Sequence, residues 1–154
     1  MATTTSIQCL CGAVKMELTG EPIAQLYCHC DDCQAVHGAA YVPAALYRIP
    51  ATRIVSGELL LWKRKVTTRA TCRECGTRVF SEPPGIGVRG VTATLLPPGL
   101  FKPTFHIQCQ HALLPSKMAC PTSRASRPRL VALMNRCPGN EPADAQYQPG
   151  SFSF

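Results

Sequence analysis

Alternating apolar and polar residues predict a β-strand near the start of the chain. Val14, Met16 and Leu18 are apolar, whereas Lys15 and Glu17 between them are charged. Successive side chains of a strand point to opposite faces of a sheet, so this period of two is typical of a strand with one buried face.

Further short apolar runs predict more strands, and turn residues separate them. The runs are Tyr41-Val42, Glu58 to Trp62, Arg78-Val79-Phe80 and Val88 to Leu95. Glycine and proline between the runs, as in Pro83-Pro84-Gly85, indicate turns. No segment keeps a period of 3.6, and we expect at most a helical turn or two after Cys30, up to Val36. The pattern therefore predicts a mainly β fold with little helix.

Beyond Pro115 the pattern changes. Six of the 14 prolines lie in the last 40 residues, and the apolar run from Leu130 to Met134 stands alone. Such a segment contains too little apolar surface to form a packed core. We therefore predict one domain over residues 7–115, followed by an irregular, disordered tail over residues 116–154.

The composition narrows the class of protein. The chain has 154 residues and 10 cysteines, and no apolar run approaches the roughly 20 residues of a membrane-spanning helix. The segment from Met1 to Ser6 is neither basic nor hydrophobic, so we expect no secretory signal and a cytoplasmic protein. Because cytoplasmic thiols stay reduced, the cysteines need an explanation other than disulfides, and metal binding is the first candidate.

Seven cysteines lie in three short clusters: Cys9-Leu10-Cys11-Gly12, Cys28-His29-Cys30-Asp31-Asp32-Cys33 and Cys72-Arg73-Glu74-Cys75-Gly76. Zinc binds thiolates about 2.3 Å away at the corners of a tetrahedron, and two close cysteines supply two corners from one turn. The first and third clusters end in glycine, which accepts the positive φ that such a turn often requires. We therefore predict that these two clusters form one closed, structural zinc site with four ligands: Cys9, Cys11, Cys72 and Cys75.

The middle cluster offers three thiolates and no obvious fourth ligand: Cys28, Cys30 and Cys33. Three protein ligands and one open position are typical of a catalytic zinc. The alternative is a second structural site completed by one of three residues: His29, His37 or Cys109. A disulfide framework is the alternative for the cysteines as a whole, although neighbours such as Cys9 and Cys11 would close strained rings.

The three clusters, in the order C-x-C-G, C-H-C-x-x-C and C-x-x-C-G-T, resemble the glutathione-dependent formaldehyde-activating enzyme family, which includes centromere protein V. The supporting residues are Gly12-Ala13-Val14, Gly76-Thr77 and the stretch from Pro103 to Ile107 with His106. The resemblance implies a β-tent, in which a structural zinc bridges antiparallel sheets and a second zinc lies near a cleft. It assigns the first and third clusters to the structural zinc and the middle cluster to a catalytic zinc, which makes two Zn²⁺ per chain.

The activity that the resemblance implies is addition of a thiol, glutathione or a similar compound, to formaldehyde or another small aldehyde. Formally this is a carbon–sulfur lyase acting in the synthetic direction. Glutathione carries two carboxylates, so we expect cations in the cleft, and the candidates are Arg48, Arg53, Arg69 and Arg89. The chain departs from the family at Thr71, where an aromatic residue is usual.

The formal charge of +7 raises a rival function, a non-catalytic zinc-binding module that engages nucleic acid or protein. The basic run Lys63-Arg64-Lys65 next to Trp62 is the candidate contact. The charge is +4 over residues 1–114 and +3 over residues 115–154. Two zinc ions held by seven thiolates would lower the charge of the domain by three. A nearly neutral domain does not favour binding to nucleic acid, and we expect small-molecule partners and no membrane.

The tail differs from the C-terminus of the resembled family. Members continue after a comparable Leu-Leu-Pro with a stretch similar to Lys-Asp-Gly-Leu-Pro-His-Phe. With suitable synonymous codons for residues 117–127, one base inserted after the first codon yields Lys-Asp-Gly-Leu-Pro-His-Phe-Lys-Gly-Phe-Pro. We therefore hypothesise that the chain from near Ser116 arose by a one-base frameshift. The alternatives are a genuine disordered tail and a copy that has lost its function.

Overall fold

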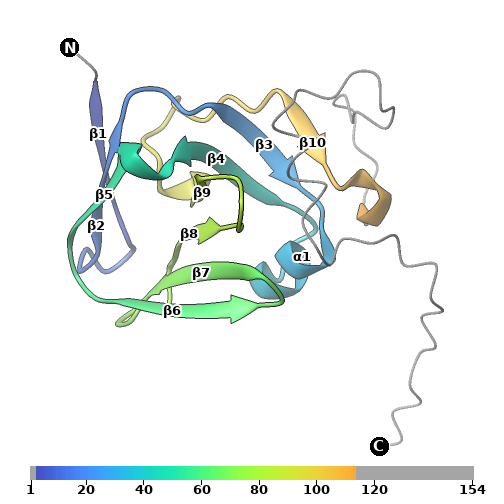
Figure 1. The fold of residues 1–154 in the computed structure, drawn as a ribbon, viewed down its shortest axis with the longest axis horizontal. Helices are drawn as coiled ribbons and strands as arrows, with labels where there is room; N and C mark the ends of the chain where they lie inside the picture. Colours follow the sequence, from blue (N-terminus) through green and yellow to red (C-terminus); the bar gives the residue numbers. More distant parts are fainter. Residues whose placement is uncertain (1–2, 114–154) are drawn as a thin grey trace, which may run out of the picture.

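The computed structural model describes residues 3–113, and within that range the chain forms two β-sheets and one α-helix (Figure 1). The smaller sheet has the strand order β1-β2-β5 and is antiparallel. Its strands are β1 (Thr4–Gln8), β2 (Lys15–Thr19) and β5 (Thr52–Ser56).

The larger sheet has the strand order β10-β3-β4-β9-β8-β7-β6. Its strands are β3 (Ala24–Cys28), β4 (Val42–Arg48), β6 (Leu59–Arg64), β7 (Thr67–Cys72), β8 (Arg78–Glu82), β9 (Val88–Thr92) and β10 (Phe105–Ile107). Neighbouring strands are antiparallel except β10, which runs parallel to β3. The helical elements are α1 (Asp31–His37) and the 3-10 turns η1 (Ile49–Ala51), η2 (Ala93–Leu95) and η3 (Cys109–His111).

The predicted mainly β fold with little helix is confirmed. Strand β2 buries Met16 and Leu18 while Lys15 is exposed, as the alternation of the sequence indicates. The predicted helical turns after Cys30 are α1, in which no residue is fully buried. One predicted strand is too long, because β9 ends at Thr92 and the chain then forms η2.

The main hydrophobic core lies between the two sheets. The smaller sheet and the turn between its first two strands contribute Ile7, Val14, Met16 and Leu18, each no more than 4% exposed. The facing residues of the larger sheet include Ala45, Tyr47, Ala70, Val79, Phe80 and Val91. Burial of these apolar side chains holds the two sheets together, and the turns that carry the cysteine clusters are thereby placed.

Helix α1 lies between the end of β3 and the turn that joins β6 to β7 (Figure 1). The contact is ionic. Oδ1 of Asp32 accepts a hydrogen bond from Nε of Arg64 at 2.7 Å, and Oδ2 of Asp32 lies 3.4 Å from Nζ of Lys65. The hairpin of β6 and β7 is thus held against the helix that follows the middle cysteine cluster.

Two groups of sequence-based predictions are not tested by the fold. The domain end at residue 115 and every prediction for the tail over residues 116–154 lie outside the described residues. The β-tent and its bridging zinc remain predictions.

Among the described residues, no helix combines the length and the apolar character that crossing a bilayer requires.

Candidate functional site

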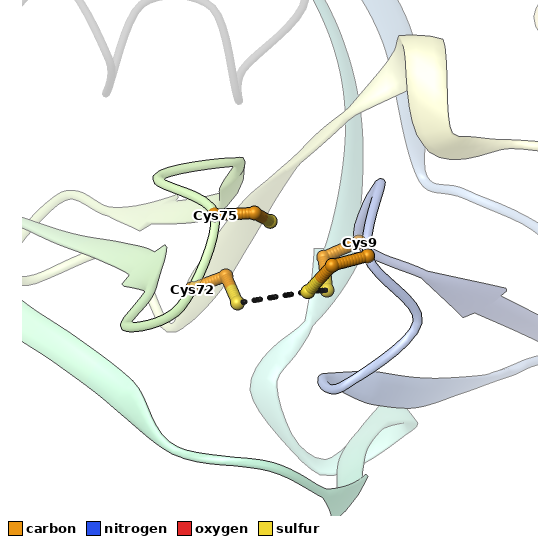
Figure 2. Close-up of side chains that lie close together, drawn as sticks. Cys9, Cys72 and Cys75 are labelled. Atoms are coloured by element: carbon orange, nitrogen blue, oxygen red, sulfur yellow. Dashed lines mark hydrogen bonds between the residues drawn. The ribbon is translucent and has the colours of Figure 1, made fainter.

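The first and third cysteine clusters meet at one point between the two sheets. The four Sγ atoms of Cys9, Cys11, Cys72 and Cys75 all lie within 4.8 Å of one another. Cys9 and Cys11 lie in the turn from β1 to β2, Cys72 ends β7, and Cys75 lies in the turn to β8. Figure 2 shows the side chains of Cys72 and Cys75 directed toward Cys9 from the opposite turn. We call these residues the four-thiol group.

The two turns have matching backbone geometry. Gly12 has a φ of 77° and Gly76 a φ of 71°, so each cluster ends in the left-handed conformation that favours glycine. The amide of Gly12 donates to the carbonyl of Cys9 at 3.0 Å, and the amide of Gly76 donates to that of Cys72 at 3.0 Å. Each turn therefore places two cysteine sulfurs on the same side, and its final glycine has the positive φ that the sequence predicts.

The four-thiol group fits a tetrahedral zinc ion. Zinc–sulfur bonds of about 2.3 Å place the sulfurs of a tetrahedron about 3.8 Å apart. The sulfurs of Cys9 and Cys11 are 3.4 Å apart, and those of Cys11 and Cys72 are 3.8 Å apart. Hydrogen bonds from the side chain and then the backbone of Thr77 lower the pKa of Cys75 to about 5, which favours the thiolate that zinc binds.

The middle cluster forms a second group of three thiols, from Cys28 at the end of β3, Cys30 and Cys33. The Sγ atoms of Cys28 and Cys33 are 3.6 Å apart. Cys30 is the N-cap of α1, where its Sγ accepts a hydrogen bond from the amide of Cys33 at 3.3 Å. Hydrogen bonds from Cys28 and Cys33 lower the pKa of Cys30 to about 3 against the effect of burial. We call these residues the three-thiol group, and their spacing also fits three corners of a zinc tetrahedron.

The suggested fourth ligands of this group stay apart from it. Among residues 3–113, neither His29, His37 nor Cys109 has a donor atom within the three-thiol group. His29 is only 1% exposed, and its Nε2 lies 2.6 Å from Nδ1 of His106. The clustered cysteines of both groups are free thiols, so no disulfide joins them.

The three-thiol group lies in the wall of a cleft with a volume of about 130 Å³. Sites for drug-sized ligands typically measure roughly 300–1,000 Å³, so this cleft suits a small molecule or the reacting end of a larger one. Its apolar lining includes Leu26, Val42, Leu46, Val91 and Ile107. Its basic side chains are His37, Lys65, Arg69 and Arg78.

Only one of the four arginines nominated from the sequence lines the cleft. Arg69 is 4% exposed, and its Nη1 donates to the carbonyls of Arg64 and Thr67 at 3.2 Å. The other three are Arg48, Arg53 and Arg89, which are absent from its lining. Arg53 pairs with Glu17 at 2.7 Å and Arg89 with Glu82 at 3.0 Å, so these two have acidic partners elsewhere.

Three basic residues of the cleft were missed by the sequence analysis, and one of them, Lys65, was considered only as a contact to nucleic acid. Arg78 stood in a predicted strand and follows Gly76-Thr77, so its closeness to a predicted metal turn was the available signal. His37 was considered only as a ligand, whereas it lines the cleft at the end of α1. Burial, followed by the charges of Arg78 and Arg69, lowers the pKa of His37 to about 4, so its imidazole is neutral near pH 7.

Comparisons with known proteins bear on the whole of this site. The sequence model of a family described as "Glutathione-dependent formaldehyde-activating enzyme" matches residues 4–111, a range that contains both cysteine groups and the cleft. No curated protein matches the chain. Among solved structures, the chain is similar to a crystal structure described as a Rhodobacter sphaeroides protein, with a TM-score of 0.51 and 24% identity over 60% of this chain and 88% of that chain. That likeness supports the fold alone.

Proposed function

Because this chain belongs to the glutathione-dependent formaldehyde-activating enzyme family, we propose that it is a zinc-dependent enzyme of the carbon–sulfur lyase type. It adds the thiol of glutathione, or of a similar compound, to formaldehyde or another small aldehyde. The observation that carries the proposal is the position of the three-thiol group in the wall of a small, basic cleft.

Both cysteine groups have a role in this proposal. The four-thiol group, Cys9, Cys11, Cys72 and Cys75, would hold a structural zinc between the two sheets, since all four corners of its tetrahedron are protein sulfurs. The three-thiol group, Cys28, Cys30 and Cys33, would hold a catalytic zinc with one position left for a ligand. When bound there, zinc supplies a Lewis acid that polarises a carbonyl oxygen or stabilises a thiolate.

The reaction needs no oxidant or reductant. The thiol sulfur forms a bond to the aldehyde carbon, the π electrons of the carbonyl move to its oxygen, and the thiol proton ends on that oxygen. The product from formaldehyde and glutathione is S-hydroxymethylglutathione. The cleft contributes by bringing the two reactants together, because orientation alone lowers the barrier of a bimolecular addition.

The basic side chains of the cleft act on the substrate thiol. The positive charges of Lys65, Arg69 and Arg78 favour an anion in the cleft, so they lower the pKa of a thiol bound there and raise the fraction of nucleophilic thiolate. The imidazole of His37 lines the same cleft. Because its pKa is lowered to about 4, His37 stays neutral near pH 7, and we assign it a hydrogen bond that orients the reactants rather than the uptake of the thiol proton.

The rival function, a zinc-binding module that engages nucleic acid or protein, has the basic run Lys63-Arg64-Lys65 as its candidate contact, and the structure gives this run a second role. Two of the three residues of the basic run, Arg64 and Lys65, contact the carboxylate of Asp32 at 2.7 and 3.4 Å. The run therefore has a role within the domain, where it holds the hairpin of β6 and β7 against α1.

The test is the rate of exchange between formaldehyde, glutathione and their adduct, measured by NMR with wild-type protein, with Cys30→Ser and without protein. Serine is a good N-cap, so Cys30→Ser should keep α1 while it removes one sulfur. We expect faster exchange with wild-type protein only. A wild-type rate equal to the uncatalysed rate would overturn the proposal.

A further inference from the structure

Arg78 has buried donors without acceptors. Its side chain lines the cleft, yet among the described residues its Nε and Nη1 are enclosed and make no hydrogen bond. Buried N–H groups are almost always paired, and leaving a charged one unpaired costs more than leaving a neutral one. Arg78 therefore carries a charge that no protein acceptor at these two atoms balances, and because its side chain lines the cleft, this charge favours an anion there.

A second guanidinium, that of Arg69, contacts the same indole ring as the guanidinium of Arg78. The Cζ atom of Arg69 is 5.6 Å, and that of Arg78 5.7 Å, from the centre of the Trp62 ring, so one indole is shared by two cations. Burial and then the charge of Arg69 lower the pKa of Arg78 to about 10, which leaves Arg78 charged at neutral pH. The two cations repel each other, and an anion bound between them would offset this repulsion.

The carboxylate that lines the cleft already has cationic partners other than the two arginines. Asp32 is the acidic residue in the lining of the cleft among residues 3–113, and its two oxygens contact Arg64 and Lys65. The three-thiol group does not balance the two arginines either. Three thiolates with one Zn²⁺ would carry a net charge of −1, against +2 on the two guanidinium groups. A surplus positive charge therefore remains for a ligand.

We propose that Arg78 and Arg69 bind the carboxylate of the substrate thiol, so that the cleft selects thiols that carry a carboxylate a few bonds from the sulfur. The inference rests on the proposed function, because it specifies the substrate class of the same cleft. A guanidinium presents a planar fork of N–H groups that matches the two oxygens of a carboxylate. The small volume of the cleft, about 130 Å³, favours a short spacer between the carboxylate and the sulfur.

The test compares two probes of nearly equal shape, 3-mercaptopropionate and its neutral amide, 3-mercaptopropionamide. Binding to the zinc-loaded full chain is measured by calorimetry, without aldehyde. We expect the wild-type protein to bind the acid about tenfold more tightly than the amide, the size of one charge-assisted hydrogen bond. Arg78→Gln should abolish this preference, and Arg78→Lys should keep part of it because the charge remains.

A matched control and a second readout separate binding from folding. Arg53→Gln removes an exposed arginine outside the cleft and should keep the wild-type preference. Arg78→Gln should also leave the midpoint of thermal unfolding unchanged or raised, because it removes a buried charge without a partner. Equal binding of acid and amide by the wild-type protein, or an undiminished preference in Arg78→Gln, would overturn the inference.

Propionate, which has the carboxylate but no sulfur, identifies the source of the anion. Weaker binding of propionate than of 3-mercaptopropionate supports a thiol substrate, whereas equal binding contradicts it, since the cleft would then be a site for free carboxylates. Different outcomes would overturn the inference and the proposed function. Catalysed exchange at equal rates for acid and amide overturns the inference alone, and a preference for the acid without catalysed exchange overturns the proposed function alone.

Discussion

The Nε2 atom of His29 lies 2.6 Å from the Nδ1 atom of His106, and both side chains are buried. Their rings stack with centres 4.9 Å apart and planes inclined by 27°. The amide of His29 also donates to the carbonyl of Ile107 at 3.0 Å. This pair joins β10 to the segment between Cys28 and Cys30, so it positions the backbone of the three-thiol group.

The histidine pair predicts that the protein loses stability in mild acid. Burial lowers the pKa of both imidazoles below the ordinary 6.5, and the charge of His29 lowers that of His106 further. Below pH 6.5 the unfolded chain therefore binds more protons than the folded one, so the free energy of unfolding falls as the pH falls. The loss is at most about 1.4 kcal/mol per pH unit for each imidazole.

The measurement is urea unfolding at pH 7.5 and pH 5.5 for the wild-type protein and for His106→Gln. Glutamine keeps a polar side chain at this position but does not titrate, so the variant should lose less stability than the wild-type protein over this interval. Equal losses in the two proteins would show that the buried pair does not cause the acid sensitivity.

Gly57 predicts a large effect of a single methyl group. It has a φ of +86°, and a Cβ atom there would lie 2.4 Å from the carbonyl oxygen of Ala13. Gly85, with a φ of +78° and nothing within 4 Å, is the matched control. Denaturant unfolding should show a loss of about 1–2 kcal/mol for Gly85→Ala, from backbone strain alone, and of about 2–5 kcal/mol for Gly57→Ala. Equal losses of stability in the two variants would contradict the close approach of Gly57 to the backbone of Ala13.

We expect a cysteine-to-serine substitution to affect thermal stability differently in the two cysteine groups. Cys72 is 2% exposed and lies in the main core, where the four-thiol group joins the two sheets. Cys72→Ser should lower the midpoint of thermal unfolding by more than about 10 °C, because a structural zinc site contributes directly to folding. Cys30→Ser, which keeps the N-cap of α1, should change the midpoint by less than about 3 °C. The reverse order would contradict the division into a structural and an open site.

Much of the site could be predicted from the sequence because it is local. The members of each cysteine cluster lie close together in the sequence: the first and third clusters lie at single turns, and the middle cluster spans the junction of β3 and α1. The glycines that end two of the clusters indicate the backbone conformation that the structure shows. The alternation around Met16 likewise shows which face of β2 is buried. These features depend on neighbouring residues, so a pattern of a few residues is enough to find them.

Apart from Arg69, the basic wall of the cleft was not predicted, because its composition depends on strand register. Strand β7 has the polar sequence TTRATC, so it gives no apolar alternation, although it buries Arg69. The pairing of β7 with β8 shifts between Ala70 and Thr71, and a shift of one residue changes which face a side chain takes. Whether Arg78 lies beside Arg69 is therefore a property of the folded sheet. The parallel pairing of β10 with β3, which brings His106 to His29, is also a long-range contact.

The central claim is that the chain holds two different zinc sites, one closed and one open, and native mass spectrometry tests it most directly. The purified full chain is measured before and after a chelator, alongside Cys30→Ser and Cys72→Ser. We predict two zinc ions in the wild-type protein, of which the chelator readily removes one, and we predict that the zinc remaining in Cys30→Ser resists the chelator. A wild-type protein with a single zinc, or two zinc ions that the chelator removes equally, would contradict the central claim.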